Sequence, residues 1–135
     1  MWRDVQRLTA KFAIPWQKPA LFPRNSTLAA RVGCAVANEP VAASYVRAAF
    51  VANFGDDEDI ADEGVIRRAL TDAGADAEAV LAQALSSAKR GLLRNNTEHA
   101  IKLGIFGAPN CVVKGELFWG EEALEDAIQW SKVDR

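Results

Sequence analysis

The two cysteines and the single histidine are the residues of this sequence best suited to nucleophilic, redox or metal chemistry. Cys34 and Cys111 lie far apart in apolar surroundings and form no Cys-x-x-Cys pair, which disfavours a dithiol redox site and a metal site. We therefore expect inert thiols, buried and reduced in the cytosol, and no metal. His99 falls within a predicted helix with no serine or cysteine partner nearby, which favours a structural role.

Four consecutive acidic residues form a second candidate for chemistry: Asp56, Asp57, Glu58 and Asp59. Clustered carboxylates can hold a cation, but these lack the ligand spacing of an EF-hand loop. We therefore expect the run to be a solvated turn.

Length and composition predict one compact domain. A chain of 135 residues, 50% of them hydrophobic, is large enough to bury a core without disulfides or metal. The net charge is −2 and the basic residues form no stripe, so nucleic acid is not an expected partner. The apolar runs are much shorter than the roughly 20 residues that cross a bilayer, and the N-terminus lacks the apolar stretch of a signal peptide. The expectation is a cytoplasmic protein with no membrane contact.

A series of helices must position the candidate residues over the first three quarters of the chain. Apolar residues recur at helical spacing over 2–13, and three prolines then make residues 14–24 an irregular connector. Capping residues, glycine stops and apolar periodicity define five further helical segments, with Asp62 and Asp76 as the N-caps of the third and fourth. These segments are 26–37, 40–54, 62–73, 76–85 and 87–103.

After Gly104 the spacing of apolar residues changes from a helical pattern to one typical of strands. Residues 110–113 have the β-branched, apolar character of a strand, and residues 116–119 alternate like a second strand. Lys114 and Gly115 supply a short turn between them. A β-hairpin is therefore predicted, followed by a last helix that opens at Gly120.

Pro109 stands in the most informative stretch, Gly104-Ile-Phe-Gly-Ala-Pro-Asn-Cys-Val-Val, at the entry to the first strand. The hairpin then leads to Leu117-Phe-Trp-Gly, two acids and a helix. Together with Phe22-Pro-Arg-Asn-Ser and Asp59-Ile-Ala-Asp upstream, this pattern resembles the C-terminal part of the kappa-class glutathione transferase family. Within that family it is most similar to the 2-hydroxychromene-2-carboxylate isomerase group, relatives of the DsbA oxidoreductases.

The resemblance implies a thioredoxin-like α/β fold of the DsbA/kappa type, mostly helical. Residues 26–103 would be an inserted helical array, and the chain would end in a ββα unit. Residues 1–25 and 104–135 would form the thioredoxin-like part of a single domain, 1–135. The family also has an N-terminal β-α-β unit, which carries the serine or Cys-x-x-Cys that activates or exchanges a thiol. The sequence shows no counterpart of that unit, so the expected fold is truncated and no catalytic residue is assigned.

The resemblance also implies a glutathione site around a cis-proline at Pro109. The backbone of Ala108 would pair with the cysteinyl unit of glutathione as an added strand. The γ-glutamyl end would lie at the start of the last helix, where Glu121 and Glu122 replace the serine and aspartate of the transferases. Glu122 would take the ammonium group and Glu121 would repel the carboxylate; alternatively, both acids only stabilise the helix dipole. Asn25 would lie near the substrate cleft, or serve only as a helix cap.

Two aromatic residues flank this segment, Phe106 before the hairpin and Trp119 at its end. They are expected either to wall the substrate cleft or to pack in the core.

Two classes of function remain open. The first is a glutathione-dependent isomerase of the 2-hydroxychromene-2-carboxylate type in aromatic-compound catabolism, in which the thiol adds, a bond rotates and the thiol leaves. The second is a non-catalytic remnant that binds glutathione or a partner, or a fragment of a DsbA-like thiol-disulfide oxidoreductase. Because a two-stranded hairpin is marginal alone, we expect a homodimer, a companion chain or a longer protein to complete the sheet.

Overall fold

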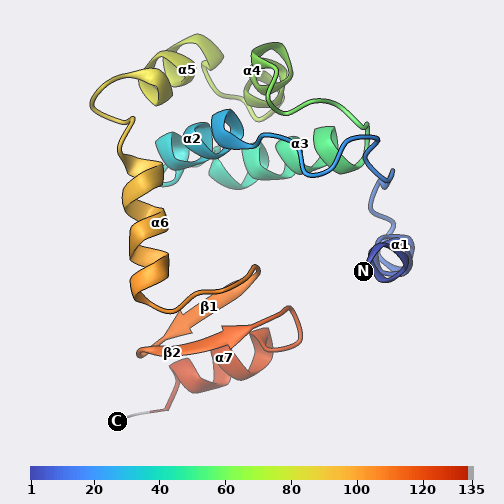
Figure 1. Cartoon of the computed structure of the whole chain (residues 1–135), viewed down its shortest axis with the longest axis vertical. Coiled ribbons are helices and arrows are strands. Elements are labelled where there is room, and N and C mark those ends of the chain that lie inside the picture. Colours follow the sequence, from blue (N-terminus) through green and yellow to red (C-terminus); the bar gives the residue numbers. More distant parts are fainter. Residues whose placement is uncertain (134–135) are drawn as a thin grey trace. The chain divides into compact units, whose positions relative to one another are not determined.

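The computed structural model describes residues 1–133, which are mainly helical (Figure 1). Within these residues a single two-stranded sheet accompanies seven helices. The helices are α1 (Trp2–Lys11), α2 (Thr27–Val36), α3 (Ala42–Phe54), α4 (Glu63–Asp72), α5 (Ala77–Leu85), α6 (Leu92–Lys102) and α7 (Leu124–Ser131), and the strands are β1 (Asn110–Val113) and β2 (Glu116–Trp119). All five helical segments predicted between residues 26 and 103 are present.

The chain divides into two compact units, Met1–Leu93 and a second that begins at Arg94. Each unit is defined by its internal contacts alone. The predicted grouping of residues 1–25 with residues 104–135, as one thioredoxin-like part of a single domain, therefore stays a prediction.

The core of the first unit lies among α2, α3, α4 and α5. Helix α4 contacts α2, α3 and α5, and α2 also contacts α3 and α5. Apolar periodicity placed the largest buried side chains on the inner faces of these helices, and small buried residues let the helices approach closely. The largest enclosed side chains are Val32, Val36, Tyr45, Ile66 and Leu70, and the buried alanines are Ala35, Ala52, Ala69, Ala77 and Ala84.

Among these large enclosed side chains, Tyr45 is the one with a hydroxyl group. Its O–H donates a hydrogen bond to the C=O of Ala29 over 2.9 Å, which satisfies a polar atom that burial would otherwise leave without a partner. The same burial raises the pKa of the Tyr45 hydroxyl, so the group stays protonated and remains a donor.

Both predicted aspartate caps are confirmed in the first unit. The carboxylate of Asp62 accepts hydrogen bonds from the N–H groups of Gly64 and Val65 at the start of α4, and that of Asp76 accepts from Ala79 at the start of α5. These bonds satisfy N–H groups that have no partner within the helix.

Replacing Asp62 with Ala is expected to lower the free energy of unfolding by about 1 kcal/mol, because two helix N–H groups lose their acceptor. Asp72→Ala is the matched control on the same helix, since an acid in the last turn caps nothing and opposes the helix dipole. Urea titration followed by circular dichroism measures both. Equal losses in the two variants would contradict the capping role.

The N-terminal part of the first unit is held by aromatic contacts. Trp2 at the start of α1 meets the rings of Trp16 and Phe22, and these two in turn meet Phe54 at the end of α3. The connector is also tied by its backbone, since the N–H of Gln17 donates to the C=O of Phe54 over 2.5 Å. The predicted irregular connector is therefore confirmed, and it lies against α3.

The second unit contains the β-hairpin and α7. Strands β1 and β2 pair antiparallel with Asn110 opposite Trp119 and Val113 opposite Glu116. Lys114 and Gly115 both have positive φ, as the two central residues of a tight hairpin turn require, so the predicted turn is confirmed. Helix α7 packs on both strands and buries Ala127.

Two predicted helix limits are wrong by more than two residues. The segment predicted over 87–103 is helical only over Leu92–Lys102, and Gly91 separates that helix from a turn in which Arg90 bonds back to Ser86. The last helix begins at Leu124 and not at Gly120, because Gly120 has a φ of +95°, outside the helical range. The apolar period alone did not reveal either interruption.

Candidate functional site

The open end of the hairpin brings together most of the residues predicted to bind glutathione. The bond between Ala108 and Pro109 is cis, and Pro109 immediately precedes β1. The N–H of Gly120 donates to the C=O of Pro109 over 3.1 Å. Through this bond and the hairpin register, Ala108 and Pro109 lie beside the segment that holds Glu121 and Glu122.

The backbone of Ala108 is open to an incoming chain. Ala108 and Pro109 are both exposed. Within residues 1–133, no hydrogen bond uses the N–H or the C=O of Ala108. These two groups have the donor and the acceptor that an extended peptide needs to pair as a further strand.

Glu121 and Glu122 lie in the turn before α7, and not within the helix as the sequence predicted. Both are exposed, and the first turn of α7 itself carries Glu125 and Asp126. The Glu122 carboxylate folds back toward Gly120, where an added Cβ would lie 2.8 Å from Oε2. Four carboxylates therefore gather at this end of the unit, which favours a cationic group over an anionic one.

Phe106 and Trp119 are not core residues. Their side chains are 71% and 59% exposed, and their ring centroids lie 5.4 Å apart. Gly107 lies against the indole of Trp119, so that a Cβ added there would meet Nε1 at 2.8 Å. The two rings thus form an exposed aromatic pair close to Ala108 in sequence, and the prediction that they wall a substrate cleft stays a prediction.

Replacing Gly107 with Ala is expected to displace the Trp119 indole, because the new methyl group occupies its present position. The indole N–H resonance of Trp119 in a ¹H–¹⁵N spectrum measures the displacement. We expect a stability loss under about 1 kcal/mol, since an exposed ring is able to move aside. Gly91→Ala is the control, because no atom lies within 4 Å of its added Cβ; an unchanged Trp119 signal in both variants would disprove the contact.

Asn25 lies in the first unit, apart in sequence from the hairpin residues. It is exposed, and its Oδ1 accepts a hydrogen bond from the N–H of Thr27 over 3.0 Å at the start of α2. The helix-cap alternative is therefore present in the structure, although Ser26 occupies the N-cap position itself. A role near substrate stays a prediction.

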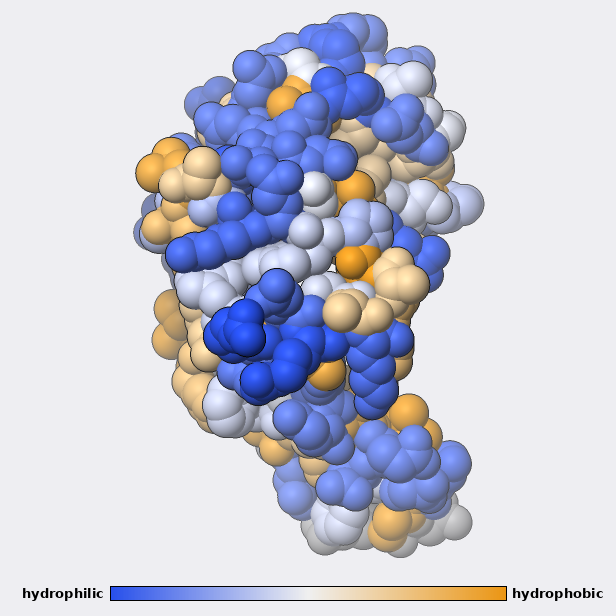
Figure 2. Space-filling model, turned by 90° about the vertical axis from the view of Figure 1, so that its right-hand side faces the viewer, coloured by the Kyte–Doolittle hydropathy of each residue, from blue (hydrophilic) through white to orange (hydrophobic). Residues whose placement is uncertain are grey.

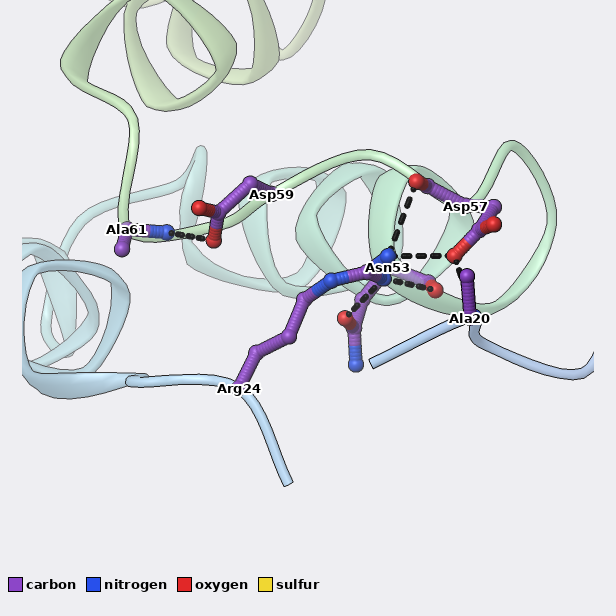
Figure 3. A network of polar contacts seen from close by, with 6 residues as sticks. All are labelled: Ala20, Arg24, Asn53, Asp57, Asp59 and Ala61. Carbon is purple, nitrogen blue, oxygen red and sulfur yellow. Dashed lines mark hydrogen bonds and ion pairs between the residues drawn. The ribbon is translucent and has the colours of Figure 1, made fainter. Parts of the chain in front are cut away.

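A buried polar network in the first unit was missed by sequence reasoning (Figure 3). The guanidinium group of Arg24 donates to the C=O and the Oδ1 of Asn53 over 3.1 and 3.0 Å, and to the C=O of Asp57 over 2.9 Å. It also forms an ion pair with the Asp57 carboxylate, in which the side chains are only 6% and 19% exposed. The N–H of Ala20 donates to the same carboxylate over 2.9 Å.

Asp57 therefore corrects the interpretation of the acidic run as a solvated turn. The Ala20 N–H and the Arg24 guanidinium hold the pKa of Asp57 below its ordinary value, against the opposing effect of burial. Glu58 pairs with Arg68, and Asp59 accepts from the N–H of Ala61. The acids mainly organise the chain between α3 and α4.

The described residues show no alternative centre for metal or disulfide chemistry. Among residues 1–133 no group of His, Cys, Asp and Glu is placed to hold a metal ion. Cys34 and Cys111 form no disulfide in this part of the chain, and both are half-buried where burial was predicted. His99 is exposed on α6. Over the same residues, no helix has the length and apolar character needed to span a bilayer.

Apolar side chains are exposed between the hydrophilic ones, as one face of the molecule shows in Figure 2. In the first unit they border two hollows. One, of about 430 Å³, lies against α2 and α3, and the other, of about 400 Å³, lies between α1, the connector and α3. Phe22, Phe50 and Phe54 border both.

Comparisons with known proteins agree with this arrangement. The sequence matches the family model of the DSBA-like thioredoxin domain over residues 1–129. It is 30% identical over 125 residues to 2-hydroxychromene-2-carboxylate isomerase of Sphingobium xenophagum, an alignment that covers 93% of this chain and 63% of the relative. The fold is similar to a solved structure of 2-hydroxychromene-2-carboxylate isomerase, with a TM-score of 0.74, 26% identity and the same two coverages. The chain thus spans less than two thirds of the length of these relatives.

The predicted fold class is confirmed by these matches. A mostly helical chain with a small sheet and a terminal helix is what the thioredoxin-like fold of this type implied, and the structural similarity extends over 93% of the chain. The chain belongs to the family of DSBA-like thioredoxin domains.

Proposed function

We propose that the chain forms the glutathione-binding and helical part of a glutathione-dependent isomerase of the 2-hydroxychromene-2-carboxylate type. The observation that carries the proposal is the 30% sequence identity to the Sphingobium xenophagum isomerase, over 93% of this chain. Because the chain spans 63% of that relative, the activity of the whole protein is itself part of the proposal.

The hairpin end fits the central part of a tripeptide thiol. Ala108 is exposed and both of its backbone polar groups are unused within the described residues. In the proposed complex these groups pair with the backbone of the cysteinyl unit of glutathione. The cis bond to Pro109 sets the direction in which the protein backbone leaves Ala108.

The acids near α7 fit the γ-glutamyl ammonium group. The Glu122 carboxylate folds back toward Gly120, whose N–H bonds to the C=O of Pro109. Glu121, Glu125 and Asp126 add negative charge around it, which attracts an ammonium group and repels a carboxylate. Glu122 is therefore proposed to bind the ammonium group, and the glutamyl carboxylate is proposed to lie away from this cluster.

The chain's own residues bind and orient in this proposal, and none of the described residues is assigned to activating the thiol. When bound, glutathione would supply a thiol that adds to an enone-like carbon and leaves after a bond has rotated, without net oxidation or reduction.

The test is turnover and binding by the 135-residue chain. Conversion of 2-hydroxychromene-2-carboxylate is followed by absorbance with and without glutathione, alongside a thermal-shift titration with glutathione. Glutathione-dependent turnover supports the isomerase. Protection without turnover supports the alternative of a non-catalytic binding protein, and absence of both refutes glutathione handling by this chain.

Glu122→Gln locates the ligand within this test. Loss of an exposed ion pair with the ligand is expected to weaken glutathione binding roughly twofold to fivefold. Glu39→Gln is the control, because Glu39 is exposed and belongs to the first unit. Equal affinity in both variants would remove Glu122 from the site.

A homodimer in the cytoplasm is proposed as the working form. The sheet of the described residues has two strands, a size that is marginal alone, so association with a second chain would stabilise it. The molecular mass in solution tests this assembly, and a monomeric mass would exclude it.

A further inference from the structure

The first unit has a hollow with the size and lining of a small-molecule site. Its volume of about 430 Å³ lies within the range of roughly 300–1,000 Å³ that such sites occupy. The walls come from the loop before α2 and from the facing sides of α2 and α3. Most of the lining is apolar, including Phe22, Ala30, Val46, Ala49, Phe50 and Phe54.

Asn53 supplies a polar group in this apolar lining. It borders the hollow and is 7% exposed. Its Oδ1 accepts from Arg24. Since a guanidinium group has donors and no acceptor, this bond fixes the amide with its oxygen toward Arg24 and its NH₂ group away from it. Figure 3 shows the Nδ2 atom pointing away from the network.

The Nδ2 donor of Asn53 is unused and reachable. None of the hydrogen bonds among the described residues has Asn53 Nδ2 as donor. The side-chain atoms that are fully enclosed without a partner in this part of the chain are those of Asn110 alone. Nδ2 of Asn53 is therefore not fully enclosed. Because Asn53 is 7% exposed and lines the hollow, a ligand bound there is placed to supply the acceptor that this donor lacks within the chain.

The charge around Asn53 selects the kind of acceptor. Arg24 is the cation next to the hollow, and its charge is paired with the carboxylate of Asp57 within the same network. The O–H of Tyr45, which also lines the hollow, already donates to Ala29. Ser26 also lines the hollow and adds an exposed hydroxyl group. The wall thus offers uncharged donors and no net charge, which suits a neutral oxygen better than an anion.

We propose that this hollow binds a neutral ring compound with a carbonyl oxygen, which accepts a hydrogen bond from Nδ2 of Asn53. The phenylalanine walls enclose the ring, and Arg24 acts as a positioning residue because it fixes the orientation of the amide. The site belongs to the first unit alone, so it does not depend on glutathione or on isomerase activity.

A matched pair of probes tests the hydrogen bond. 1-Tetralone and tetralin have the same fused rings and differ in one carbonyl oxygen. Calorimetric titration of the full chain, without glutathione, is expected to show tetralone binding roughly threefold to tenfold more tightly. Equal affinity for the two probes, or binding of neither, overturns the proposal on the unmodified protein alone.

Asn53→Asp removes the donor and keeps an oxygen acceptor for Arg24, so the network is retained. The preference for tetralone over tetralin is expected to disappear in this variant, with circular dichroism and the thermal midpoint confirming the fold. A preference that survives the substitution assigns the hydrogen bond elsewhere and contradicts the proposal.

Two filling variants distinguish the two hollows. Ala30 lines the proposed site and Thr9 lines the other hollow of the first unit. Ala30→Phe is expected to weaken the binding of both probes tenfold or more, whereas Thr9→Phe is expected to leave their affinities unchanged. The reverse pattern would place the probes in the second hollow and overturn the assignment.

Discussion

Replacing Leu70 with Ala is expected to lower the free energy of unfolding of the first unit by about 2–5 kcal/mol. Leu70 is 0% exposed and lies on α4, the helix that contacts α2, α3 and α5. Truncating it removes apolar burial and leaves a cavity that rigid helices fill only in part. The loss is large because the whole stability of a domain is usually only about 5–15 kcal/mol.

Urea titration followed by far-ultraviolet circular dichroism measures the change. Leu85→Ala on α5 is the matched control, because the same atoms are removed from a side chain that is 39% exposed. Its cost is expected to stay under about 1.5 kcal/mol, since less area leaves water. If the two variants lost the same stability, α4 would not be the centre of the core.

Local sequence signals explain which elements could be predicted. Asp62 and Asp76 each precede an apolar helical pattern, and each caps a helix through its own carboxylate. Lys114 and Gly115 stand between two alternating segments and form the turn. In each case the residues that fix the conformation lie within a few positions of one another, so the sequence alone was sufficient.

The errors arose where a distant contact or one backbone angle decided the outcome. Arg24 and Asp57 form a buried pair across 33 positions, and no local pattern links a proline-rich connector to an acidic run. The start of α7 depends on the positive φ of Gly120, and the helical spacing of apolar residues carries no information about that angle. The orientation of the Asn53 amide depends in turn on its hydrogen bond from Arg24, so it also could not be predicted from the local sequence.

The hairpin site shows the intermediate case. Ala108, Pro109, Glu121 and Glu122 were selected by family resemblance, and no residue pattern alone required them to meet. The register of β1 and β2 and the bond from Gly120 to Pro109 place the two segments side by side. Their proximity therefore follows from the hairpin, whereas their role toward glutathione still depends on the proposed function.

Replacing Arg24 with Met is expected to lower the free energy of unfolding by about 1–3 kcal/mol, because enclosed acceptors lose their donor while the partly exposed Asp57 carboxylate keeps some contact with water. The Arg24 side chain is 6% exposed and donates to four oxygens of Asn53 and Asp57. Met fills much of the volume but leaves these acceptors without their donor. Arg67→Met is the control, since its ion pairs with Glu63 and Glu78 are partly exposed and are expected to contribute at most about 1 kcal/mol.

The dependence of stability on pH separates the charge of Asp57 from its hydrogen bonds. Its folded-state pKa lies below the unfolded value of about 3.9, so the stabilisation is complete above that pH and is lost as the pH falls through the folded pKa. Asp57→Asn keeps an oxygen for Ala20 and Arg24 and does not titrate, and Asn tolerates the positive φ at this position. Unfolding titrations of both proteins below about pH 4 are therefore expected to show a smaller acid-induced loss in the variant. Parallel curves would mean that the Asp57 carboxylate has the same pKa in the folded and unfolded chain, and that the Ala20 N–H and the Arg24 guanidinium contribute nothing to acid sensitivity.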